Sequence, residues 1–110
     1  SPWYWGSSVV YEGVIIGNLG GAVRKHQPAV TPSLDDAPMA VTVPLRLMSD
    51  KSREVQYRFT FFDAAGRPLS PEMDWRWKVM PARALIHLQG AALDDRAVDW
   101  RLEVRPYKET

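Results

Sequence analysis

The chain has 110 residues, of which 45% are hydrophobic and 25% are charged, and its formal net charge is +1. This length and composition predict one globular domain over residues 1–110, which needs neither a metal nor a disulfide in order to fold. The sequence contains no cysteine, which excludes disulfides and thiolate metal sites, and the low net charge argues against a nucleic-acid partner.

The first eight residues form an aromatic segment in which Trp3, Tyr4 and Trp5 follow one another. Large aromatic side chains are enriched at contact sites because they bury a large area with few rotamers to restrict. The segment therefore either packs over an open end of the domain or forms an interaction surface, of which a homodimer contact is one form.

Two strands are predicted in the first half of the chain, from Val9 to Ile16 and from Met39 to Met48. Between them, Gly17 to Pro38 is rich in glycine and proline and predicts a long loop or an irregular crossing. Pro44 interrupts the second strand, which is therefore expected at a sheet edge or with a bulge, since proline cannot donate to a ladder. The extended residues of such an edge would add to the interaction surface. They are Val41, Val43 and Leu45.

The clearest strand runs from Val55 to Phe62, where apolar and polar residues alternate strictly until the last position. This period of two predicts one buried, largely aromatic face and one solvated face. The next four residues begin with Asp63 and end with Gly66, which is typical of a type I turn.

Three further strands are predicted at Trp75 to Met80, Ala84 to Gln89 and Val98 to Val104. Strands joined mostly by short turns favour an all-β fold, an antiparallel, immunoglobulin-like β-sandwich of six to seven strands, with a small barrel as the alternative. The predicted core residues are Tyr57, Phe59, Phe61, Trp77, Leu88, Trp100 and Leu102.

No pattern of catalytic, cofactor-binding or metal-binding residues is present, so no cofactor is expected. His26 and His87 lack the neighbouring ligands of a zinc site. The acidic pairs Asp35-Asp36 and Asp94-Asp95 lie in predicted loops, where aspartate serves turns. The glycine-rich stretch 17–21 lacks the lysine and hydroxyl residue of a phosphate loop.

The stretch 55–66, which contains Tyr-Arg-Phe and later Phe-Asp-x-x-Gly, resembles the YcfL-like family of small Gram-negative envelope lipoproteins. The similarity in strand order extends from Leu45 to Val104. Matching positions are Trp75, Pro81, Ala92 and the strand 100–104.

This resemblance implies a β-sandwich, export to the periplasm, and anchoring in the outer membrane by a lipid on a cysteine just before Ser1. Membrane contact is expected only through that anchor, and residues 1–8 would then act as a tether.

The sequence leaves three classes of function open. We favour a non-catalytic cell-envelope domain that binds another protein or a cell-wall component, which requires only an exposed apolar surface or sheet edge. A small-ligand carrier would need an aromatic pocket between the sheets, with a volume of hundreds of cubic ångströms. A small hydrolase would need a polar cleft with convergent titratable groups.

Overall fold

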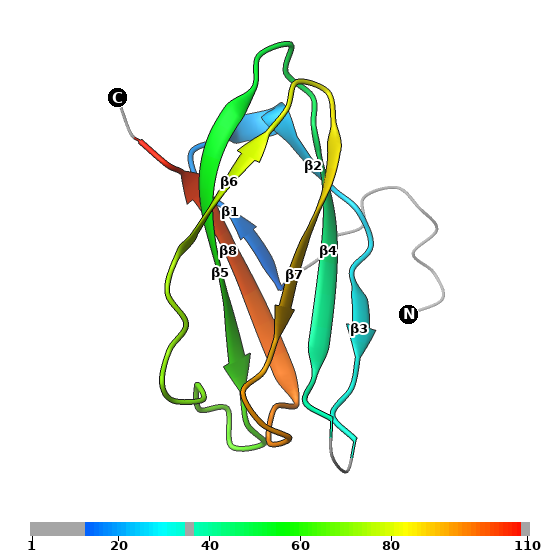
Figure 1. Ribbon diagram of the computed structural model, residues 1–110, viewed down its shortest axis with the longest axis vertical. Coiled ribbons are helices and arrows are strands. Elements are labelled where there is room, and N and C mark those ends of the chain that lie inside the picture. The colour runs from blue at the N-terminus through cyan, green and yellow to red at the C-terminus, as the bar shows by residue number, and fades with distance from the viewer. Residues whose placement is uncertain (1–12, 35–36, 109–110) are drawn as a thin grey trace.

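The computed structural model describes residues 13–34 and 37–108, which form eight β-strands in two sheets (Figure 1). The strands are β1 (Val14–Ile16), β2 (Val23–Lys25), β3 (Ala29–Thr31), β4 (Ala40–Leu47), β5 (Arg53–Phe62), β6 (Arg76–Met80), β7 (Leu85–Ala91) and β8 (Asp99–Pro106). One 3₁₀ turn, η1 (Gly20–Ala22), is the only helical element of this part of the chain. The predicted all-β class is confirmed.

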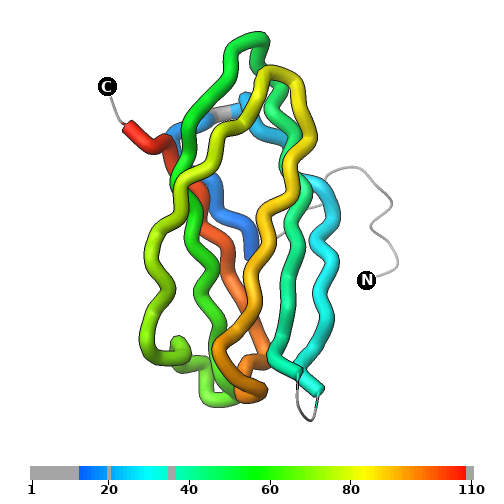
Figure 2. The backbone as a smooth tube through the Cα atoms, viewed as in Figure 1, coloured from blue at the N-terminus to red at the C-terminus, as the bar shows by residue number. Residues whose placement is uncertain are grey.

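The first sheet has the strand order β1-β8-β5-β6. Its pairs are antiparallel except for β1, which runs parallel to β8 with Val14 opposite Leu102. In the second sheet β4 is central, with β7 on one flank and both β2 and β3 on the other. The two sheets face each other (Figures 1 and 2). The described chain begins next to β1 and ends just after β8, and both of these strands belong to the first sheet.

The core lies between the sheets and contains the inward residues of β4, β5, β7 and β8. Phe59, Phe61, Leu88 and Leu102 are buried as predicted, and Tyr57 and Trp100 are half-buried against them. The prediction for Trp77 is wrong, because its side chain is 54% exposed.

The pairing of β5 with β6 explains the position of Trp77. Lys78 lies opposite the fully buried Val55, and residues directly opposite each other in an antiparallel pair share a face. Lys78 therefore faces inward, and Trp77 is directed outward with its partner Gln56. Alternation in the sequence identified the two faces of β6 but not which of them is covered.

The predicted loop from Gly17 to Pro38 contains η1, β2 and β3, so the strand number of six to seven is corrected to eight. Both strands have only three residues, too few for a detectable alternation, and they form because β4 offers them a free flank. Residues 9–12 of the first predicted strand lie outside the described residues.

The expected edge position of Pro44 is wrong, because β4 has partners on both flanks. The amide of His26 donates to the carbonyl oxygen of Pro44 (3.0 Å), and the N and O atoms of one strand residue point to the same flank. The missing donor of Pro44 therefore faces residues 26–28, where the ladder is interrupted between β2 and β3. Because no strand pairs with β4 at this point of that flank, no strand hydrogen bond requires an amide hydrogen at position 44.

The predicted turn after β5 is confirmed. The amide of Gly66 donates to the carbonyl of Asp63 (2.9 Å), and Gly66 has a φ of 79°, which glycine adopts without strain. The Asp63 carboxylate also accepts hydrogen bonds from the amides of Ala65 (2.9 Å) and Arg67 (3.0 Å).

Candidate functional site

The strands β6 and β7 are the edges of their sheets on the same side of the molecule, and they lie side by side in both ribbon and tube views (Figures 1 and 2). In the described chain, β6 pairs only with β5, and β7 only with β4. An open cleft of about 840 Å³ lies between them. It is lined by parts of β4, β5, β6 and β7, by the segment 71–74 and by Leu93.

The opposite side of the sandwich is closed by side chains. Lys25 on β2 donates its Nζ hydrogen bond to the carbonyl oxygen of Val14 on β1 (2.8 Å), which joins the outer strands of the two sheets. Near the other end, the Ser33 hydroxyl donates to the carbonyl of Ala97 (2.8 Å). The open side is therefore a feature of β6 and β7 rather than of the whole sandwich.

The floor of the cleft is aromatic. The ring of Phe59 lies over the backbone of Gly90, where a Cβ atom would be only 2.5 Å from it. Tyr57 contacts the Phe59 ring edge-on, with ring centroids 6.3 Å apart. Phe61 stacks against the Phe59 ring, with centroids 6.1 Å apart. This arrangement gives the cleft an aromatic base that includes the half-buried Tyr57.

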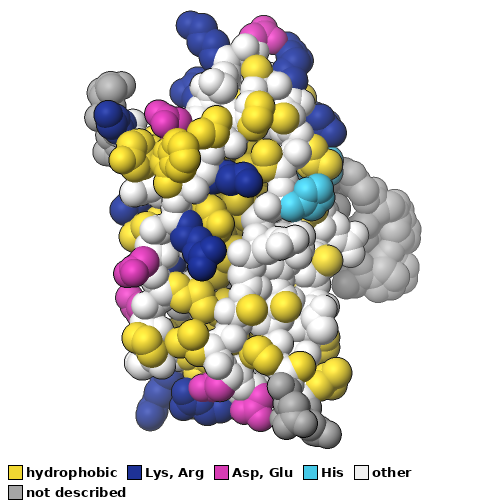
Figure 3. Space-filling model, viewed as in Figure 1, with side chains coloured by type: hydrophobic (Ala, Val, Ile, Leu, Met, Phe, Trp, Pro, Cys, Tyr) yellow, Lys and Arg dark blue, Asp and Glu magenta, His cyan; other side chains and the backbone are white. Residues whose placement is uncertain are grey.

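On β6 the cleft is lined by the basic residue Arg76, and Lys78 follows it on the same face of the strand, beyond the cleft lining. Arg76 lies opposite Tyr57 and Lys78 opposite Val55, so both cations are on the inward face of their strand. Within the described residues, neither takes part in an ion pair or a side-chain hydrogen bond. Figure 3 shows Lys and Arg side chains lying across apolar surface on this side of the molecule.

The segment 71–74 supplies carboxylates to the cleft. Glu72 lies 3.7 Å from the guanidinium of Arg58, which also contacts Glu103 at 3.3 Å. Asp74 is exposed next to them. The lining of the cleft therefore combines the carboxylates of Glu72 and Asp74 with the cations of Arg58 and Arg76.

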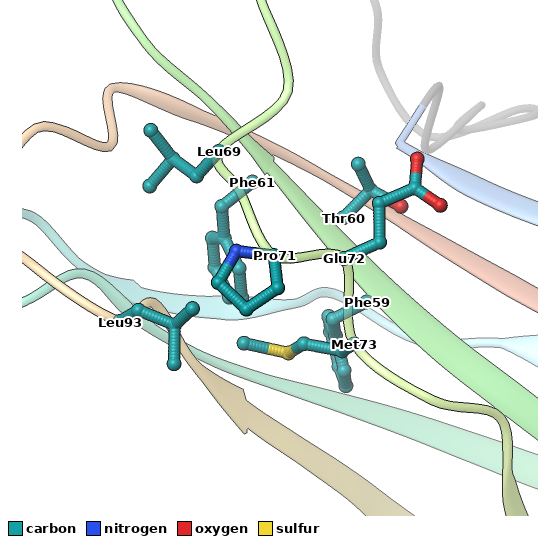
Figure 4. A pocket seen from close by; sticks show the side chains of 8 residues that line it. All are labelled: Phe59, Thr60, Phe61, Leu69, Pro71, Glu72, Met73 and Leu93. Atoms are coloured by element: carbon teal, nitrogen blue, oxygen red, sulfur yellow. The ribbon is translucent and has the colours of Figure 1, made fainter.

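A second, much smaller cavity of about 10 Å³ lies beneath this segment (Figure 4). The side chains of Phe61, Pro71, Met73 and Leu93 gather around it, whereas the Glu72 carboxylate points away. A space of this size holds no more than about one water molecule. A ligand larger than a water molecule would therefore have to bind in the open cleft.

The outer face of the first sheet carries arginines stacked on aromatic rings. The guanidinium of Arg105 lies 3.7 Å from the ring centre of Trp75, and that of Arg58 lies 4.6 Å from it. Arg101 lies 5.3 Å from the ring centre of Phe62. These cations are partly satisfied by π-faces and by Glu103, unlike the two on the cleft side.

The family model of DUF1425, described as a protein of unknown function, matches residues 14–106. The chain belongs to the DUF1425 family. Two solved structures resemble it. One is cj0090 from Campylobacter jejuni, with 27% identity and a TM-score of 0.70 over 86% of this chain and 97% of that one.

The other structure is a DUF1425 family member from Shewanella sp. pv-4. It has 20% identity and a TM-score of 0.65, over 80% of this chain and 79% of that one. A search of curated proteins finds no match.

The expectation that β4 contributes exposed residues to an interaction surface is wrong for this DUF1425 domain. Val41, Val43 and Leu45 are at most 1% exposed and belong to the core, since β4 is an interior strand. The expected aromatic residues of the surface lie outside the described residues. They are Trp3, Tyr4 and Trp5.

The sequence did not reveal that residues such as Tyr57, Arg76 and Gly90 come together to line a cleft. Only Gly90 carried a local signal, because a glycine inside an apolar strand often marks a close approach of another group. In the sequence, Arg76 and Lys78 resemble the solvated face of a strand. They face inward because β6 pairs with β5, and this pairing cannot be inferred from the local sequence.

The other candidate residues do not come together as a metal site in the described chain. No cluster of three or more His, Asp or Glu side chains that could hold a metal ion occurs there. Asp94 accepts hydrogen bonds from the side chain and the amide of Arg96, which hold the pKa of its carboxyl below the ordinary value. This carboxylate therefore stabilises a turn, and Asp35-Asp36 lies outside the described residues.

No helix in the described chain is both long and apolar enough to cross a membrane.

Proposed function

We propose that this DUF1425 domain is a non-catalytic binding module that holds an extended segment of a partner protein in the cleft between β6 and β7. The observation that supports it is the pair of unpaired edge strands facing one open, apolar-floored cleft. An extended segment can add to a free edge through main-chain hydrogen bonds, while the cleft selects alternate side chains.

The charges of the cleft indicate which segment would fit. Arg76 and Lys78 have no carboxylate partner in the described residues, so acidic side chains on the bound segment could form ion pairs with them. Its next inward residue would meet the apolar floor around Tyr57 and Phe59. The expected ligand is an extended peptide that alternates acidic and apolar residues on one face.

The cellular setting is a proposal that rests on the resemblance of stretch 55–66 to the YcfL-like lipoproteins. The domain would be exported and held at the periplasmic face of the outer membrane by a lipid on a cysteine before Ser1. Reading the codons upstream of Ser1 tests this. A signal sequence ending in such a cysteine supports it, and a start codon with no apolar segment after it overturns it.

A second candidate function is binding of a small apolar molecule in the same cleft. Its volume of about 840 Å³ lies within the range of small-molecule sites. Such a ligand would contact the floor around Phe59 and would not need the backbone of either edge strand.

Selection of displayed peptides on the purified chain, followed by amide shift mapping, distinguishes the two candidates. We expect the selected peptides to contain acidic residues and to shift amides along β6 or β7. Arg76→Glu should weaken their binding about tenfold or more, as for the loss of one partly buried charge pair.

Arg67→Glu is the matched control, because Arg67 is exposed in the turn after β5 and makes no ion pair in the described chain. Peptides that shift no amide of β6 or β7 would overturn the peptide-binding proposal. A small apolar probe that shifts only floor residues would favour the second candidate instead.

A further inference from the structure

The charges of the molecule are divided along its long axis. The turn 48–52 between β4 and β5, the turn 81–84 between β6 and β7, and the end of β8 meet at one end of the sandwich. The Arg83 amide donates to the carbonyl of Ser49 (3.1 Å), and the Tyr107 amide donates to that of Glu54 (2.9 Å). We call this the basic end.

The segments that form the basic end are 23–25, 46–55, 78–85 and 105–108. They contain nine Lys or Arg and two Asp or Glu, a net charge of +7. The remaining described residues contain five Lys or Arg and seven Asp or Glu, a net charge of −2. The overall charge of +1 therefore conceals a strongly polar molecule.

Apolar side chains protrude among these cations. Met48, Trp77, Val79, Leu85 and Tyr107 are each at least a third exposed, and they come from four different segments of the chain. Trp77 and Tyr107 contact each other edge-on, with centroids 6.4 Å apart. Figure 3 shows Lys and Arg side chains interspersed with apolar groups around the upper end.

We infer that the basic end docks on a membrane surface that contains anionic lipids. Lys and Arg are attracted to anionic headgroups, and Trp and Tyr favour the boundary between headgroups and acyl chains. This proposal is independent of the cleft, and it adds a direct contact of the folded domain with the bilayer to any contact through an anchor.

The length of the molecule supports this orientation. Electrostatic attraction fades over about 8 Å at physiological ionic strength, whereas an eight-residue strand spans about 26 Å. The carboxylates in the turns at the opposite end are therefore too distant to oppose docking when the strands stand upright on the surface. The electrostatic attraction to the lipids would therefore depend on the net charge of the basic end alone.

A lipid surface fits the basic end better than another polyanion does. Nucleic acid would use the cations but leave the protruding Met48, Val79 and Leu85 without an apolar environment. An acyl-chain boundary accepts both groups at once. Asp50 is already paired with Arg83, which leaves Lys51 and Arg53 free to meet headgroups.

Sedimentation of the full chain with vesicles tests the inference. Vesicles of equal parts phosphatidylglycerol and phosphatidylcholine should bind the chain at 50 mM NaCl and release most of it at 500 mM. Pure phosphatidylcholine should bind at least tenfold less. On the mixed vesicles the tryptophan emission should shift to the blue, and Trp77→Ala should reduce that shift.

Two charge-reversal variants locate the contact. Lys51→Glu/Arg53→Glu should lower the partition coefficient at least tenfold, whereas Arg67→Glu/Arg96→Glu, with the same change in net charge at the other end, should lower it less than twofold. Equal losses in both variants, or no binding to anionic vesicles at 50 mM NaCl, would overturn the inference. So would displacement from the vesicles by an equimolar single-stranded oligonucleotide, which would identify a nucleic-acid surface.

Discussion

Phe59 and Gly90 join the two sheets through a contact that leaves no room for a side chain at position 90. A Cβ atom there would lie 2.5 Å from Cδ2 and 2.7 Å from Cγ of the Phe59 ring. The strand β7 can approach β5 this closely only because residue 90 is glycine. The same contact sets the depth of the cleft, since the ring forms its floor.

Gly90→Ala should lower the free energy of unfolding by about 1–3 kcal/mol, because the added methyl group would lie within 3.0 Å of three atoms of the Phe59 ring, so that the ring or the strand has to shift. Urea denaturation measures the change. Gly21→Ala is the control, since nothing lies within 4 Å of a Cβ at that position. Combining Gly90→Ala with Phe59→Leu should recover part of the loss, and a Gly90→Ala protein as stable as the original would contradict the packing described.

Trp77 and Trp100 should respond differently to truncation. Trp77→Ala should cost about 1 kcal/mol or less, because the side chain is exposed and mainly contacts Tyr107. Trp100→Ala should cost about 3 kcal/mol, since its ring packs on Gly13 and near Phe59. Thermal and urea unfolding of both variants check the order, and a larger loss for Trp77→Ala would contradict the assigned faces of β6.

The turn after β5 depends on the Asp63 side chain. Asp63→Ala removes the acceptor of the Ala65 and Arg67 amides and should destabilise the domain by about 1 kcal/mol. Asp63→Asn keeps an oxygen acceptor in place and should retain most of the stability. Equal losses in the two variants, measured by urea denaturation, would show that the amide bonds are not the cause.

The Asp94 carboxyl should titrate below its ordinary value of 3.8, because the Arg96 side chain and then the Arg96 amide bond its charged form. A depressed folded pKa means that the contribution to stability is present above the unfolded value and is lost as the pH falls through the folded value. Carbon-detected NMR titration of the carboxyl measures the midpoint. Arg96→Ala should raise it toward 3.8, and an unchanged midpoint would contradict the assigned cause.

Much of the fold could be predicted from local patterns. The strands at 39–48, 55–62, 75–80, 84–89 and 98–104 all occur, with their ends shifted by a few residues, because alternation and turn residues act within each segment. The aromatic face of β5 is buried for the same reason. Local patterns therefore suffice where a strand has one clearly apolar face.

The predictions from sequence were wrong where strand pairing determines which residues are buried. In β6 both faces carry long side chains, and only the register with Val55 turns Lys78 inward and Trp77 outward. The tolerance of Pro44 in an interior strand depends on the interruption between β2 and β3, which the sequence does not reveal. The cleft and the basic end combine segments that are distant in the chain, so neither has a local signature.

The parallel alignment of β1 with β8 determines how the domain bears a mechanical load. The first residue of β1, Val14, lies opposite Leu102 in the middle of β8, and both strands run toward the basic end, where β8 ends. The two strands are joined by hydrogen bonds such as those from the Leu102 amide to the Gly13 carbonyl (2.7 Å) and from the Gly17 amide to the Val104 carbonyl (2.9 Å). A pull on the two ends slides one strand along the other and loads these bonds together. A hairpin would instead open one bond at a time. The first strand, although only three residues long, thus acts as a clamp against stretching.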